Sequence, residues 1–254
     1  VYKRQRADFR SAGRLDERRH HHTATLLPDG HVLVVGGLGD SGFLASAEVW
    51  APTAASFEPA GVLAEARIRH TATLLPDGRV LVVAGRSGPD VRASAEVWDP
   101  AAGSFNPAGS LAEARDGHTV TLLPDGRVLV VGGLGDRDVV ASAEVWDPVT
   151  GSFSPAGTLA EARQHHTATL LPDGRVLVVG GQGGPDALAS AEVWNPATAS
   201  FEPAGALAEA RVGHTATLVD GGRVLVVGGR GVIEPAPGTP FEGNPYEFRT
   251  TAEV

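Results

Sequence analysis

Hydrophobic and polar positions along the chain follow one pattern that returns every 48 residues, as His22, His70 and His118 show. Each copy holds a segment such as residues 79–83, whose last four residues are all apolar, which indicates a strand buried on both faces. A Pro-Asp-Gly triplet precedes this run and predicts a tight turn. A period of 40 to 50 residues is typical of an array of identical supersecondary units.

Each unit is expected to contain four short strands and a connector. In the second copy, turn sequences at residues 76–78 and 99–103 separate the strands. The connector consists of good helix formers, but it supplies little more than one turn and is too short for an independent helix. The predicted strands and the connector are residues 70–75, 79–83, 94–98, 104–109 and 111–115.

Four short antiparallel strands without a crossover helix predict an all-β fold, a β-propeller of four-stranded antiparallel blades. A blade cannot bury its own faces, so neighbouring blades must cover it. Small Thr and Ala residues in the first strand suit the crowded centre, whereas Trp and Phe fill the wider outer wedge. A parallel β-solenoid is the main rival, but its rungs are shorter and lack hairpin turns.

The predicted strands of this chain are enough to form five blades. We expect residues 1–6 to be a disordered extension and residues 7–254 to be the propeller, which begins in a fourth strand at about residues 7–13. That strand completes the last blade if the ring closes with five blades. The alternative, which we favour, is a fragment of a longer propeller, because the chain lacks Met and Val254 lies in mid-strand.

Composition removes several classes of protein. The net charge of −9 argues against nucleic-acid binding, and no apolar run approaches the ~20 residues of a membrane span. The absence of Cys excludes disulfides and thiolate metal sites. Of the 21 Lys and Arg residues, only Lys3 is a Lys. This preference for Arg, together with abundant Ala, Gly and Pro, suggests a bacterial coding sequence. We expect a monomer, and a secreted or cell-surface location is favoured.

The repeated residues resemble the kelch motif, whose blade carries a Gly-Gly doublet, an aromatic residue followed by Asp-Pro, and a second aromatic residue. Here these are Gly132-Gly133, Trp146-Asp147-Pro148 and Phe153. The resemblance extends over roughly residues 7–229 and implies a propeller that serves mostly as an interaction platform. It also implies a distant similarity to galactose oxidase, but that enzyme's copper site needs Tyr ligands and a Cys–Tyr crosslink, and this chain has two Tyr and no Cys.

Differences between the copies gather in two segments that share one face of a propeller, the inter-blade connector and the loop between the second and third strands. Variable residues on a rigid scaffold are typical of a binding surface, although loops also tolerate change without function. The last copy has a longer loop with aromatic residues, which either anchor a ligand or plug the channel. The candidate binding residues are His21, Arg69, Asp116, Gln164, His165, Arg92, Arg137, Phe241, Tyr246 and Phe248.

Residues repeated in every copy are assigned structural roles. We expect each repeated His to make a hydrogen bond across a blade seam, and the repeated Arg and Glu, such as Arg115 and Glu144, to form inter-blade ion pairs. No motif supports a metal, a cofactor or a catalytic site. We therefore predict a non-catalytic scaffold that binds a protein or a glycan. The alternatives are a carbohydrate-active or oxidase-like propeller enzyme using His21, Arg69 and His165, or a purely structural module of a larger surface protein.

Overall fold

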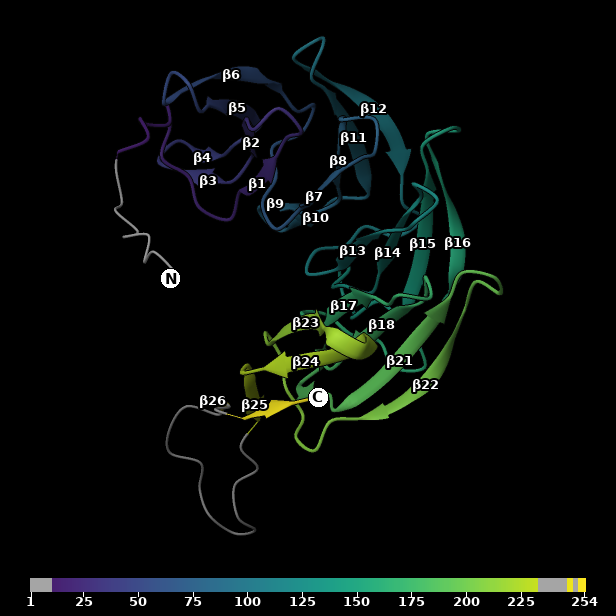
Figure 1. The fold of residues 1–254 in the computed structure, drawn as a ribbon. Coiled ribbons are helices and arrows are strands. Elements are labelled where there is room, and N and C mark those ends of the chain that lie inside the picture. The colour runs from purple at the N-terminus through teal and green to yellow at the C-terminus, as the bar shows by residue number, and fades with distance from the viewer. Residues whose placement is uncertain (1–10, 233–245, 249–250) are drawn as a thin grey trace, which may run out of the picture.

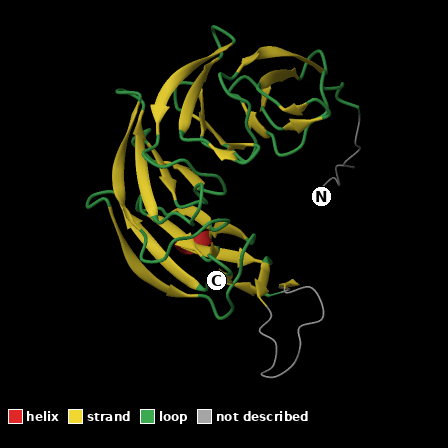
Figure 2. Cartoon of the chain, turned by 180° about the vertical axis from the view of Figure 1, so that it is seen from behind, coloured by secondary structure: helices red, strands yellow, loops and turns green. Residues whose placement is uncertain are grey.

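The chain forms an arc of antiparallel sheets that follow one another in sequence order (Figure 1). The computed structural model describes residues 11–232, 246–248 and 251–254. The two ends of the arc are not joined, and the view from behind shows the same open arrangement (Figure 2). The described residues contain no α-helix, and Asp220–Gly222 forms a single 3-10 turn. The prediction of an all-β propeller is confirmed, whereas a closed ring is not observed.

Four of the blades are four-stranded sheets, and the fifth blade is a three-stranded sheet. The first blade consists of β1 Thr23–Leu26, β2 Val32–Val35, β5 Ser46–Ala51 and β6 Ser56–Val62. The second consists of β7 Thr71–Leu74, β8 Val80–Val83, β11 Ser94–Asp99 and β12 Ser104–Ser110. The third consists of β13 Thr119–Leu122, β14 Val128–Val131, β15 Ser142–Asp147 and β16 Ser152–Thr158. The fourth consists of β17 Thr167–Leu170, β18 Val176–Val179, β21 Ser190–Asn195 and β22 Ser200–Ala206. The fifth consists of β23 Thr215–Val219, β24 Arg223–Val227 and β27 Ala252–Glu253.

Within each blade the strands lie in sequence order, from the inner strand to the outer strand, as in β13-β14-β15-β16. The first strands line the inside of the arc and the fourth strands its outside (Figure 1). The expected strand over residues 7–13 is wrong for its described part, because residues 11–13 form no strand. Residues 1–10, and with them the predicted extension, lie outside the described residues. Among the described residues, no N-terminal strand pairs with the fifth sheet, whose strand order is β23-β24-β27.

The loop between the second and third strands folds into a short hairpin, which the sequence did not predict. Copies one, two, four and five form two-stranded sheets there, and the third copy forms a single bridge, Leu134 with Val139. These strands are β3 Leu38–Gly39, β4 Gly42–Phe43, β9 Arg86–Ser87, β10 Asp90–Val91, β19 Gln182–Gly183, β20 Asp186–Ala187, β25 Arg230–Val232 and β26 Tyr246–Phe248.

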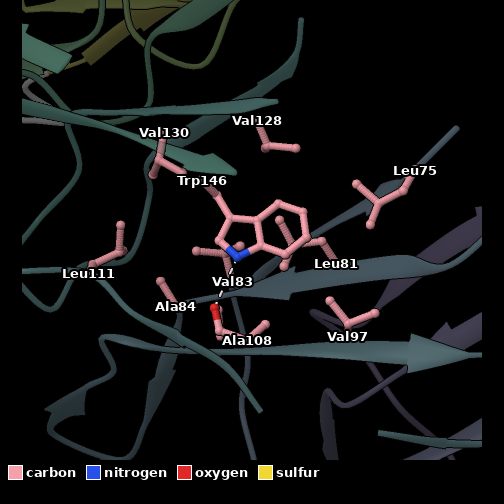
Figure 3. Close-up of a cluster of buried hydrophobic side chains, with 11 residues drawn as sticks. Leu75, Leu81, Val83, Ala84, Val97, Ala108, Leu111, Val128, Val130 and Trp146 are labelled. Carbon is pink, nitrogen blue, oxygen red and sulfur yellow. Dashed lines mark hydrogen bonds between the residues drawn. The ribbon is translucent and has the colours of Figure 1, made fainter. Parts of the chain in front are cut away.

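The hydrophobic core lies in the seams between consecutive blades. Figure 3 shows one seam, in which Trp146 of β15 lies against Leu81 and Val83 of β8. Trp146 is 1% exposed, and its Nε1–H donates to the carbonyl oxygen of Ala108 on β12 at 3.0 Å. The indole thus fills the wedge and satisfies its polar atom on the neighbouring blade. The expectation that aromatic side chains occupy the inter-blade wedge is confirmed.

A second link crosses the same seams near the inner edge. His118 Nε2 lies 3.0 Å from Thr71 Oγ1 of the preceding blade, and the other three seams repeat this hydrogen bond. The expected structural role is confirmed for His70, His118, His166 and His214, which have a described blade before them. Burial, and then the charge of the preceding Arg, lowers the pKa of His70, His118 and His166 to about 3 and that of His214 to about 4. These rings are therefore neutral near pH 7.

A buried ion pair ties each connector to the blade that it enters. Arg115 is fully buried, and its Nη2 lies 3.0 Å from Glu144 Oε1 on β15. Its remaining N–H groups donate to Gly132 O, to Ser142 and to Glu113 O, while Glu144 Oε2 accepts from the Ala112 backbone N–H. Every donor of the guanidinium therefore has a partner, as a buried charge requires. Arg–Glu pairs are confirmed in all five copies, with Glu253 serving in the last. The expectation that they join two blades is wrong, because each pair lies between a connector and the blade that follows it.

The substitution Glu144→Ala should lower the free energy of unfolding by about 3–5 kcal/mol, because it leaves Arg115 charged and unpaired in the interior. Chemical denaturation measures the change. Arg127→Ala provides the control, since it breaks an exposed ion pair with Asp125 at 2.7 Å and should cost at most about 1 kcal/mol. Equal losses in the two variants would contradict this account of the buried pair.

Stability should fall in acid because of the seam histidines. The unfolded histidines bind protons below pH 6.5, whereas the folded ones stay neutral down to about pH 3. The stabilisation is therefore complete above pH 6.5 and is lost as the pH falls toward 3, by about 1.4 kcal/mol per pH unit for each His. Urea unfolding measures the free energy of unfolding at pH 7 and at pH 5. Its decrease between these two pH values should be about 2 kcal/mol smaller in His118→Gln than in the unsubstituted chain.

Candidate functional site

The two variable segments of each copy lie side by side on one face. Ile68 in the second connector and Arg86 in the following loop exchange two backbone hydrogen bonds of 2.9 Å. Equivalent bridges join the connector and the loop in every copy: His20 with Leu38, Asp116 with Leu134, Gln164 with Gln182 and Val212 with Arg230. The expectation that both variable segments share a face is confirmed. We call this set of connectors and loops the variable face.

One connector position on this face is always in the left-handed backbone region. Two copies use Gly there, at Gly117 and Gly213, whereas the others place His21, Arg69 and His165 at φ of 52° to 54°. A side chain in this region costs about 1 kcal/mol or more. Left-handed Ala residues also occur away from the face, so the strain alone marks no site. The distinguishing feature is that long polar side chains stand where Gly would be unstrained.

A buried carboxylate brings two of the arginines together across a seam. Asp116, in the connector of the third blade, has a fully buried side chain. Its Oδ2 lies 3.3 Å from Arg86 Nη1 and 3.8 Å from Arg69 Nη1, both on the second blade. Neither carboxylate oxygen accepts a hydrogen bond from a described residue. Asp116 therefore holds the two guanidinium groups near one another without saturating their donors.

His165 continues this cluster onto the fourth blade. Its backbone N–H donates to Gly117 O at 2.9 Å, so consecutive connectors are linked around the arc. Burial and then the charge of Arg69 lower the pKa of His165, and Asp116 opposes the shift. With Arg230, this exposed histidine lines a pocket of about 400 Å³ that also includes Val212, Gly213 and Gly229. We call Arg69, Arg86, Asp116, His165 and Arg230 the rim cluster.

The remaining sequence candidates lie elsewhere or outside the described side chains. His21 stacks near His20 with ring centroids 4.8 Å apart, and Arg92 lies 3.3 Å from Glu65. Gln164 neighbours His165 in the connector, and Arg137 is exposed on the loop of the third blade. Phe241, and the side chains of Tyr246 and Phe248, lie outside the described residues, so their binding role stays a prediction.

Sequence reasoning missed Arg86 and Arg230, although both were within the variable loops that it singled out. The signal that identifies them is the bridge to the connector, which needs the hairpin geometry. Among the described residues no group of three or more His, Asp or Glu is placed to hold a metal ion. The rim cluster is open and shallow and does not include His21, so it differs from the deep pocket that the catalytic alternative requires.

The third and fourth copies match the family model of the Kelch motif over residues 118–160 and 165–207. These two copies are kelch repeats. The copies at the two ends of the array have the same period and the same seam contacts as the matched ones. No curated protein matches the chain. No helix in the described part of the chain is long and apolar enough to cross a membrane.

Replacing His21 by Gly should raise the free energy of unfolding by about 0.5–1 kcal/mol, because Gly adopts the φ of 54° without strain. His21→Ala serves as the control, since it removes the same ring and keeps a Cβ. Thermal or urea unfolding of the two variants gives the comparison. A higher free energy of unfolding in both variants would show that the imidazole ring, and not the backbone strain, destabilises the chain at this position.

Proposed function

We propose that the chain is a non-catalytic kelch scaffold that binds a protein partner through its variable face, with the rim cluster as the contact for an acidic group. The observation that carries this proposal is the convergence of Arg69 and Arg86 on the buried Asp116. A fixed framework of seams holds these side chains, while the residues themselves differ between copies. This arrangement is what a binding surface on rigid elements requires.

The charge of the rim cluster supports an acidic partner. Arg69 and Arg86 contribute two guanidinium groups against the single carboxylate of Asp116, in a chain whose net charge is −9. A guanidinium binds a carboxylate through two parallel hydrogen bonds, which gives geometry as well as energy. Neutral His165 can donate or accept one more hydrogen bond at the edge of the pocket.

The size of the variable face favours a macromolecule over a small ligand. The rim pocket is open, and the connectors and loops of five copies extend the face well beyond it. Gln164, Arg92, Arg137 and His21 are proposed as peripheral contacts on this face. Such a surface binds through a few central residues surrounded by contacts of smaller effect.

A peptide display library, screened on the immobilised chain beside a glycan array, tests the proposal. We expect the selected peptides to be rich in Asp and Glu and to lose affinity as salt rises. The double variant Arg69→Gly/Arg86→Gln should bind them at least tenfold more weakly. Arg69→Gly also removes the backbone strain of a left-handed side chain, so this change should not destabilise the fold. Unfolding measurements on the double variant then show whether weaker binding comes from the lost arginines or from a loss of folded protein.

A charge-matched control lies on the opposite face. Arg79→Gln/Arg127→Gln removes two arginines from the invariant Pro-Asp-Gly turns and should leave peptide binding unchanged. Equal weakening by both double variants would reject the rim cluster as the contact. If the chain bound glycans on the array but selected no peptide, the proposed protein partner would be rejected in favour of a carbohydrate.

A further inference from the structure

A second pocket, separate from the rim cluster, opens on the variable face over the third blade. It has a volume of about 660 Å³ and lies between the connector residues 112–114 and the loop residues 135–142. Its lining includes the exposed carboxylates of Glu113, Asp136 and Asp138. Among the described residues, Asp136 and Asp138 form no ion pair and no side-chain hydrogen bond. Glu113 already has partners on one oxygen, because its Oε2 accepts from the hydroxyl of Ser142 and lies 3.7 Å from Arg115 Nη2. The negative charge without a partner in the described part of the chain is that of Asp136 and Asp138.

The second blade shows what the same place holds when it is filled. Arg92 occupies the position equivalent to Val140, and its Nη1 lies 3.3 Å from Oε1 of Glu65. Glu65 is the equivalent of Glu113, one repeat earlier. In that blade the carboxylate therefore receives a guanidinium from within the chain. The third blade keeps the carboxylate but replaces the Arg by a short apolar residue.

The other two blades fill this position differently. Leu44 and Leu188 are longer than Val140, and their side chains lie close to the loop residues Gly39 and Gly183. The two loop aspartates also distinguish the third blade, because only this copy has Asp at both positions: the others read Asp40 and Gly42, Gly88 and Asp90, and Gly184 and Asp186. The first blade also has a pocket beside its equivalent carboxylate, Glu17, of about 450 Å³. What distinguishes the third blade is the combination of the larger pocket with aspartates at both loop positions.

We propose that this pocket binds an alkylguanidinium group, the side chain of an arginine presented by a protein partner. The planar fork of donors suits the carboxylate of Glu113, with Asp136 and Asp138 supplying further acceptors around it. The arrangement of Arg92 on Glu65 provides the template for the bound group. Exposed Arg137 lies at the pocket edge, and its positive charge opposes the ligand. This site is independent of the acidic partner proposed for the rim cluster.

A nuclear magnetic resonance titration with N-acetyl-argininamide tests the site without any protein partner. Saturable shifts are expected in residues 112–114 and 135–142. N-acetyl-citrullinamide, which has the same shape and no charge, should bind at least tenfold more weakly. Free arginine should bind no better than the capped compound, because its carboxylate meets the acidic lining. Equal binding of the capped arginine and citrulline compounds would overturn the proposal.

Variants of the pocket give the second arm of the experiment. Val140→Arg should reproduce the arrangement of the second blade and weaken binding of the capped arginine at least fivefold. Glu113→Gln should weaken it similarly, whereas Arg137→Gln should strengthen it about twofold by removing a like charge. Glu161→Gln changes the equivalent residue of the fourth blade and should have no effect. Unfolding curves confirm that each variant is folded, and unaltered binding by a folded Val140→Arg variant would disprove the assignment.

Discussion

No blade of this chain buries its own faces, so every other feature depends on contact between consecutive sheets. Three interactions in each repeat secure that contact. The seam His bonds the preceding blade near the inner edge, and the seam Trp does so near the outer edge. The buried Arg–Glu pair ties the connector onto the blade that it enters. Because these polar groups are satisfied only in one register, they select that register as well as stabilising it.

This rigidity leaves the variable face free to differ between copies. Its backbone is fixed by the bridges between connectors and loops, which occur in all five repeats whatever the side chains are. A side chain such as Arg69 can then occupy a left-handed position, since the surrounding hydrogen bonds keep the backbone there. The same framework carries a basic cluster at the rim and an acidic pocket over the third blade.

The sequence was informative wherever the copies agree. The strands, the invariant turns, the aromatic wedge, the seam histidines and the Arg–Glu pairs all followed from residues that recur at one interval, because a repeated residue must satisfy a repeated environment. The loop hairpins were missed because two-residue strands such as Arg86–Ser87 have no hydrophobic period to reveal them. The meeting of Asp116 with Arg86 was also missed, since it joins two variable positions from different blades.

The candidate sites could not be identified by aligning the copies alone; the structure was also required. Aligning the copies shows that Val140 stands where the second copy has Arg92, but it does not show that the Arg reaches Glu65. Once that distance is known, each blade becomes a reference for its neighbours, and a difference between copies acquires a physical meaning. The third blade lacks that guanidinium, and in the described part of the chain the Glu113 carboxylate keeps only the partners of its Oε2, Ser142 and Arg115. In an array of near-identical blades, binding chemistry is therefore found where a repeat departs from a contact that its neighbours complete.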